Sequence, residues 1–191
     1  MKKLTHAEIL KERLSVEESL SVKRFPVSLM IVDVRSLYNV GSIFRTADSA
    51  RVKELILCGF TPHPPRKEIE KTALGAVDSV PWCYVKNAID KIMSLKAEGI
   101  KVIAVEITSK KRLYTTLTKS EYPVCLVLGN ELTGLSNEII KLCDDAIEIP
   151  MFGRKHSLNV SVAAGIVLFE AVRIWQNDST KIIQAFSNQI E

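Results

Sequence analysis

The sequence predicts an α/β fold with a mostly parallel sheet and helices on both of its faces. Short apolar runs alternate with longer segments of helical periodicity along most of the chain. The runs are continuously apolar, which is typical of strands buried on both faces. Strands separated by helices indicate parallel crossovers. The chain has 191 residues, 47% of them hydrophobic, which is enough for one domain with a sizeable core.

Residues 1–26 predict a basic helical extension. Thr5 and Glu8 have the spacing of a capping box, and Ser15 and Glu18 repeat it. The basic residues of this arm are Lys2, Lys3, His6, Lys11, Arg13, Lys23 and Arg24. The arm is therefore either a solvated helical face or a surface that contacts RNA.

The α/β domain is expected to span residues 27–176. Strands are expected at 27–34, 54–60, 82–85, 101–107, 123–129 and 146–150. Helices are expected at 39–50, with Asn39 as N-cap, and at 87–99, 136–144 and 157–176. Residues 61–68 are expected to form a loop stiffened by three prolines. In the tail, 177–191, the positions of Ile182, Ile183 and Phe186 suggest a short amphipathic segment.

Composition limits the class of protein. The net charge of +4 is compatible with a polyanionic partner without proving one. The four cysteines contain no C-x-x-C pair and predict small buried side chains in a reducing compartment, without a metal site. The N-terminus lacks a signal peptide's apolar core, and the longest apolar run, 162–169, is too short to span a bilayer. We expect a soluble cytoplasmic protein.

The first of three candidate site loops is "DVRSLYNVGSIFRTAD". Its single glycine, Gly41, disfavours a dinucleotide-binding loop. Arg45 is turned away from the core-facing Ile43 and is expected to lean back toward the helix start beside Asn39. An arginine there suits a phosphate. The alternative is a surface arginine paired with Asp48.

The second loop, "LGNELTGLS", resembles a phosphate-binding P-loop only in its glycines. Leu135 occupies the position of the essential lysine, and Glu131 would repel a triphosphate, so an NTPase is excluded. The glycines are expected to let the backbone approach another ligand. Glu131 is expected to hold a cation or an arginine, or merely to lie near a favourable helix dipole.

The third loop, "IPMFGRKHSLNVSVAAG", places polar residues before an apolar helix. Ser157 is either the N-cap of that helix, or it binds a ligand together with Asn159 and unpaired backbone N–H groups. No G-x-S-x-G turn surrounds Ser157, which disfavours hydrolysis next to His156.

Together, "NVGSIFRTADSARV", "LVLGNELTGLS" and "IPMFGRKHSLNVSVAAGIVLFEA" resemble the three motifs of the SpoU (TrmH-type) RNA methyltransferases of the SPOUT superfamily. The resemblance covers about residues 27 to 172. It implies a C-terminal deep trefoil knot, S-adenosylmethionine as methyl donor, a homodimer, and 2′-O-methylation of a ribose in tRNA or rRNA.

The resemblance also implies roles for individual residues. The catalytic residues would be Asn39, Arg45, Glu131, Ser157 and Asn159. The cofactor-binding residues would be Val105, Glu106, Leu128, Gly129, Ile149, Met151, Ser157 and Leu158. Because a sulfonium methyl group is already electrophilic, no metal is needed. We expect Arg45 to clamp the ribose and its phosphate and to stabilise developing oxyanion charge, since arginine does not readily release a proton.

The RNA target stays open at this point. With no separate N-terminal RNA-binding domain expected, tRNA is slightly favoured over rRNA. A rival hypothesis is a non-catalytic knotted RNA-binding protein, although a pure binder would not need all five catalytic residues. A small-molecule methyltransferase is a third hypothesis.

Overall fold

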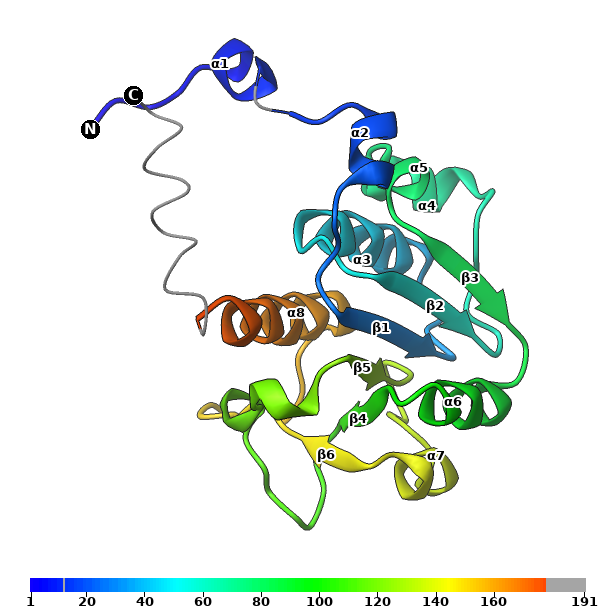
Figure 1. Cartoon of the computed structure of the whole chain (residues 1–191). Coiled ribbons are helices and arrows are strands. Elements are labelled where there is room, and N and C mark those ends of the chain that lie inside the picture. Colours follow the sequence, from blue (N-terminus) through cyan, green and yellow to red (C-terminus); the bar gives the residue numbers. More distant parts are fainter. Residues whose placement is uncertain (12, 178–191) are drawn as a thin grey trace.

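The fold is built on a six-stranded sheet in the order β3-β2-β1-β5-β4-β6, and every strand pair is parallel. The computed structural model describes residues 1–11 and 13–177 (Figure 1). The strands are β1 (Val27–Val32), β2 (Glu54–Cys58), β3 (Trp82–Val85), β4 (Lys101–Val105), β5 (Val124–Leu128) and β6 (Asp145–Ile147). The predicted parallel α/β fold is confirmed.

Helices cover both faces of the sheet. They are α3 (Leu37–Ser49), α4 (Lys67–Ala73), α5 (Ala76–Ser79), α6 (Ala88–Ala97), α7 (Asn137–Leu142) and α8 (Val160–Asn177). Alternate β1 residues enter two different cores. Leu29 packs in a core with residues of α3, α4 and α8, whereas Met30 packs in a core with residues of α6 and α7 (Figure 1). Burial on both faces explains why the strands are continuously apolar.

Two predicted helix caps are wrong by a few residues. Helix α3 begins at Leu37, and its N-cap is Ser36, whose hydroxyl accepts the Asn39 N–H at 3.3 Å. Helix α8 begins at Val160 rather than at Ser157, because the side-chain oxygen of Asn159 accepts the Ser161 N–H at 2.9 Å. Both shifts leave the predicted cap residue free for other contacts.

Helices α4 and α5 are absent from the sequence-based prediction, and α4 begins inside the predicted loop 61–68. Both are short, and α4 packs closely on α3. A Cβ atom on Gly41 would lie 2.1 Å from the Thr72 hydroxyl oxygen and 2.3 Å from the Ile69 carbonyl oxygen. The single glycine of the first motif therefore serves the contact between two helices, not a phosphate.

The N-terminal arm forms the two predicted helices, α1 (His6–Lys11) and α2 (Val16–Ser21), the second with a complete capping box. Arg24 connects the arm to the domain by donating to the carbonyl oxygens of Ser19, Val52 and Ser79 at 2.7, 3.2 and 2.6 Å. The arm is thus attached beside α5 and β2.

Beyond the helices on the two faces, the segment between β4 and β5 has structure of its own. Two further short 3₁₀ helices, Tyr114–Thr116 and Lys119–Glu121, lie between β4 and β5. The cysteines are unpaired, and burial raises the pKa of the Cys83 and Cys143 thiols to about 11. None of the helices within the described residues is long and apolar enough to cross a membrane. The knot stays a prediction, and the predicted tail segment at 182–186 lies outside the described residues.

Candidate functional site

The candidate site lies at the carboxyl end of the sheet, where three loops meet. A chain of side chains joins them. The Asn39 side-chain amide donates to the Glu131 carboxylate at 3.0 Å, and the Asn159 amide donates to the Asn39 side-chain oxygen at 3.0 Å. The three motifs, far apart in the sequence, are therefore in direct contact. We call these residues the Glu131–Asn39–Asn159 chain.

Glu131 anchors this chain through three hydrogen bonds to its carboxylate. Besides the Asn39 amide, its carboxylate accepts the backbone N–H groups of Arg35 and Ser36 at 2.9 and 3.1 Å. Partial burial alone would raise the pKa of Glu131. The hydrogen bonds from Arg35, Asn39 and Ser36 outweigh it, and the pKa is lowered overall. Glu131 therefore carries its charge at neutral pH and fixes the start of α3 against the loop after β5.

Beside this chain lies a cavity of about 280 Å³. All eight residues predicted to bind a cofactor line it: Val105, Glu106, Leu128, Gly129, Ile149, Met151, Ser157 and Leu158. Three carboxylate residues line the cavity: Glu106, already counted, and Glu131 and Glu148. Among the described residues, its lining contains one histidine, His156, and neither lysine nor arginine. The structure thus brings the predicted residues together around one space.

The wall of the cavity after β5 is a tight turn. Asn130 and Gly134 exchange backbone hydrogen bonds of 2.9 and 3.2 Å, and the Glu106 carboxylate accepts the Leu135 N–H at 2.9 Å. A Cβ atom on Gly129 would lie 2.3 Å from the Gly134 carbonyl carbon. Gly129 was expected to make room for a ligand, but the structure shows that it first makes room for this turn.

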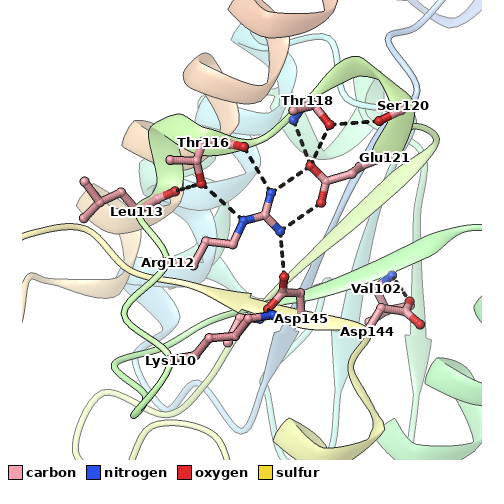
Figure 2. A network of polar contacts seen from close by, with 11 residues as sticks. Val102, Lys110, Arg112, Leu113, Thr116, Thr118, Ser120, Glu121, Asp144 and Asp145 are labelled. Carbon is pink, nitrogen blue, oxygen red and sulfur yellow. Dashed lines mark hydrogen bonds and ion pairs between the residues drawn. The ribbon is translucent and has the colours of Figure 1, made fainter.

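Another part of the cavity lining depends on an ion-pair network that the sequence did not reveal (Figure 2). Arg112 donates to Glu121 at 2.8 and 2.9 Å and to Asp145 at 2.9 Å, and Lys110 donates to Asp145 at 2.8 Å. The Glu148 N–H donates to the Arg112 carbonyl oxygen at 2.8 Å. The network therefore holds the segment that precedes Ile149 of the cavity.

The pKa values in this network are shifted in the direction that favours its charges. Hydrogen bonding to Glu121 and Asp145 raises the pKa of Arg112 against the opposing effect of burial. Burial would raise the pKa of Glu121, but the hydrogen bonds from Arg112 and Thr118 lower it overall. Burial would also raise the pKa of Asp145, but the hydrogen bonds from Lys110, the Ala146 N–H and Arg112 lower it overall. Arg112, Glu121 and Asp145 stabilise one another's charges at short range, and their side chains are only 15–18% exposed, whereas that of Lys110 is 64% exposed.

The structure also places two further predicted catalytic residues, Ser157 and Arg45. Ser157 is exposed at the cavity, and its hydroxyl makes no hydrogen bond to the described part of the chain. Arg45 does not line the cavity, nor does it pair with Asp48, whose carboxylate accepts from the Ser79 hydroxyl. Instead, Arg45 lines a second groove between the N-terminal arm and α3. The other basic residues of this groove are His6, Arg13, Arg24 and Arg51.

Two curated proteins are similar in sequence to this chain. A 23S rRNA (guanosine-2′-O-)-methyltransferase, RlmB, of Vibrio parahaemolyticus is 34% identical over 83% of this chain. This chain spans only 63% of that relative's length. A tRNA (guanosine(18)-2′-O)-methyltransferase of Aquifex aeolicus is 31% identical over 86% of this chain and 78% of its own.

A solved structure is similar as well. The AdoMet-bound rRNA methyltransferase of Sinorhizobium meliloti superposes with a TM-score of 0.73 at 34% identity. The match covers 79% of this chain and 57% of that one. The model of the SpoU rRNA Methylase family matches residues 26–169, which include the first two motifs and the third as far as Phe169. With its motifs joined at one cavity in this way, the chain belongs to the SpoU rRNA Methylase family.

Proposed function

We propose that this protein is an S-adenosylmethionine-dependent RNA 2′-O-ribose methyltransferase that acts on tRNA or rRNA. One observation carries the proposal: eight predicted cofactor residues surround one cavity, and the Glu131–Asn39–Asn159 chain lies beside it. Relatives that methylate the 2′-oxygen of guanosine in rRNA or tRNA, and a neighbour with bound AdoMet, support it.

The cavity fits the cofactor chemically. Val105, Leu128 and Ile149 provide apolar walls suited to a planar base. The lining has three carboxylate residues and no lysine or arginine, so its field favours a cation such as a sulfonium ion. When bound, S-adenosylmethionine would supply an electrophilic methyl group.

The chain's own residues would orient the RNA. Glu131, which lines the cavity, holds Asn39, and Asn39 in turn holds Asn159, so the two amides can fix a ribose beside the cavity for in-line approach. Ser157 has an unengaged hydroxyl at the same cavity and can contact the same ribose. Because Arg45 lies outside the cavity, we assign it to the RNA backbone, where its donors would hold a phosphate and stabilise developing negative charge.

The rest of the chain has proposed roles as well. Residues 27–176 would form the methyltransferase domain, and the basic arm 1–26 would contact RNA phosphates along the groove of Arg45. The exposed side chains of Val162 and Phe169 on α8, 50% and 51% accessible, would form part of a homodimer interface.

Methyl transfer from labelled S-adenosylmethionine to tRNA and rRNA from cells lacking the gene tests the proposal. Mapping the 2′-O-methyl sites would identify the target, with tRNA as the first candidate. Arg45→Ala should lower the transfer rate by a factor on the order of 10²–10³, with cofactor affinity within a few-fold of wild type. RNA binding without cofactor binding or methyl transfer would favour a non-catalytic RNA-binding protein instead.

A further inference from the structure

Phe60 exposes 67% of its surface on the turn that follows β2. That turn is rigidly held. The buried Thr61 hydroxyl donates to the Cys58 carbonyl oxygen at 2.6 Å and accepts the Val34 N–H at 3.1 Å. The Phe60 N–H itself donates to the Asp33 carboxylate at 3.0 Å. A single exposed apolar residue is ordinary, but an aromatic ring presented by so fixed a backbone is preorganised for a contact.

Phe60 lines a hollow at the carboxyl end of the sheet, separate from the cofactor cavity. Lys86, Asp33 and Glu138 line the same hollow, which therefore combines an aromatic face, an ammonium group and carboxylates. Lys86 and Glu138 are exposed, so both are available to a ligand.

A second exposed aromatic residue supports the turn from β3. Tyr84 is 40% exposed, and its hydroxyl donates to the Gly59 carbonyl oxygen at 2.7 Å. Its ring lies 4.5 Å from the ring of the exposed His63, centroid to centroid. Aromatic side chains therefore gather around this turn, beside Lys86 at the end of the same strand.

The hollow is connected to the candidate site through Asp33. The Asp33 carboxylate holds the Phe60 N–H, and its carbonyl oxygen accepts from the Asn130 side chain at 2.7 Å. Asn130 immediately precedes Glu131, which is one end of the Glu131–Asn39–Asn159 chain. A nucleotide next to one bound at that chain would thus come close to Phe60.

We propose that this hollow binds an unstacked base of the substrate RNA, adjacent to the nucleotide that is methylated. This inference rests on the proposed function. The base stacks on Phe60, as single-stranded RNA does on exposed aromatic rings. Its phosphate lies near Lys86, because the carboxylates of Asp33 and Glu138 would repel it elsewhere in the hollow.

The carboxylates also predict which bases are accepted. Adenine, cytosine and guanine each carry an exocyclic amino group that can donate to Asp33 or Glu138, whereas uracil has none. The hollow should therefore disfavour uridine at one position beside the target.

Substitutions at Phe60 test the stacking contact with tRNA and rRNA from cells lacking the gene. Phe60→Ala should raise the Kd for RNA roughly 5- to 150-fold, and Phe60→Tyr should bind as the wild type does. Met93→Ala is the matched control, because Met93 is 56% exposed on α6 and lies outside the hollow. Cofactor affinity should be unchanged in all three variants.

Two further measurements separate phosphate contact from base contact. Lys86→Gln should make the slope of log K for RNA binding against log salt concentration shallower by about 0.7, the value for one lost phosphate contact on a single strand. Once the target is mapped, uridine placed at one neighbouring position should weaken wild-type binding and cause little further loss in Phe60→Ala.

The outcomes distinguish this inference from the proposed function. A wild-type protein that neither binds RNA nor transfers methyl groups refutes both. If the wild type methylates RNA while Phe60→Ala binds as tightly as it does, only the base site is refuted. An equal loss in Phe60→Ala and Met93→Ala would also overturn the base site, because it would show a nonspecific effect.

Discussion

Replacing Glu131 with glutamine keeps the size of the side chain and removes its charge. In the structure the two carboxylate oxygens accept from three donors: the N–H groups of Arg35 and Ser36 and the amide of Asn39. A glutamine has one oxygen and one NH₂ group at these positions. Its NH₂ must face at least one of the three donors, so at least one charge-assisted hydrogen bond is lost.

The expected magnitude follows from that loss. A hydrogen bond to a charged group contributes roughly 1.5–3 kcal/mol. If this energy holds Asn39 and Asn159 where the ribose must bind, the rate of methyl transfer should fall about 10- to 150-fold. Cofactor affinity should change less, because the eight lining residues predicted to bind the cofactor remain intact.

Single-turnover methylation and cofactor titration would be measured on the same preparation, with hydrogen exchange at the Arg35 and Ser36 amides. Faster exchange should accompany the slower transfer. Glu98→Gln is the matched control, because Glu98 is exposed at the end of α6 and, among the described residues, its carboxylate accepts only from the Ser94 hydroxyl. A near-normal rate in Glu131→Gln, with unchanged exchange, would refute the positioning role of the carboxylate.

Three further outcomes are expected. Gly129→Ala should lower the free energy of unfolding by roughly 1–3 kcal/mol and weaken cofactor binding, because the new Cβ atom would lie 2.3 Å from the Gly134 backbone. Thermal unfolding would measure the first effect and calorimetry the second. Gly153→Ala is the control, because a Cβ atom there would meet nothing within 4 Å among the described residues. The lowered pKa values of Glu121 and Asp145 mean that their contribution to the free energy of unfolding is present above the unfolded-state pKa values and is lost as the pH falls through the folded-state values. Arg112→Met should therefore be less stable at neutral pH and lose less further stability on acidification, as measured by urea unfolding across pH. Val162→Glu should yield a monomer in sedimentation equilibrium, and a wild-type protein that is itself monomeric at micromolar concentration would contradict the proposed dimer.

Local pattern was sufficient for the framework. The apolar runs predicted all six strands, since a strand buried on both faces leaves a continuous apolar signal in the sequence. The capping boxes at Thr5 and Ser15 also predicted α1 and α2. Helices α4 and α5 escaped prediction because their N-cap residues, Arg66 and Gly75, make no side-chain cap hydrogen bond and give no start signal in the sequence, and α4 packs against Gly41.

The resemblance to family motifs predicted which residues form the site, but it did not predict how they are arranged. The sequence named Asn39, Glu131 and Asn159 without showing that they hydrogen-bond in series. The prediction that Arg45 leans beside Asn39 stays a prediction. The sequence did not show that Arg45 also lines a groove with the arm and the α4–α5 segment, because helical rotation specifies a direction but not the neighbouring elements.

The sequence by itself determined the parallel α/β class, the six strands and the residue types of the three motifs, because periodicity and motif spacing are local properties. The tertiary structure alone decided which partners those residues meet. Arg112, Glu121 and Asp145 carry no motif, yet their ion pairs support the cavity wall, and Phe60 becomes a candidate binding surface only because Asp33 links its turn to Asn130. Such contacts depend on the order in which strands join the sheet, with β1 beside β5 and β4 beside β6, and that order is set by the packing of the whole chain.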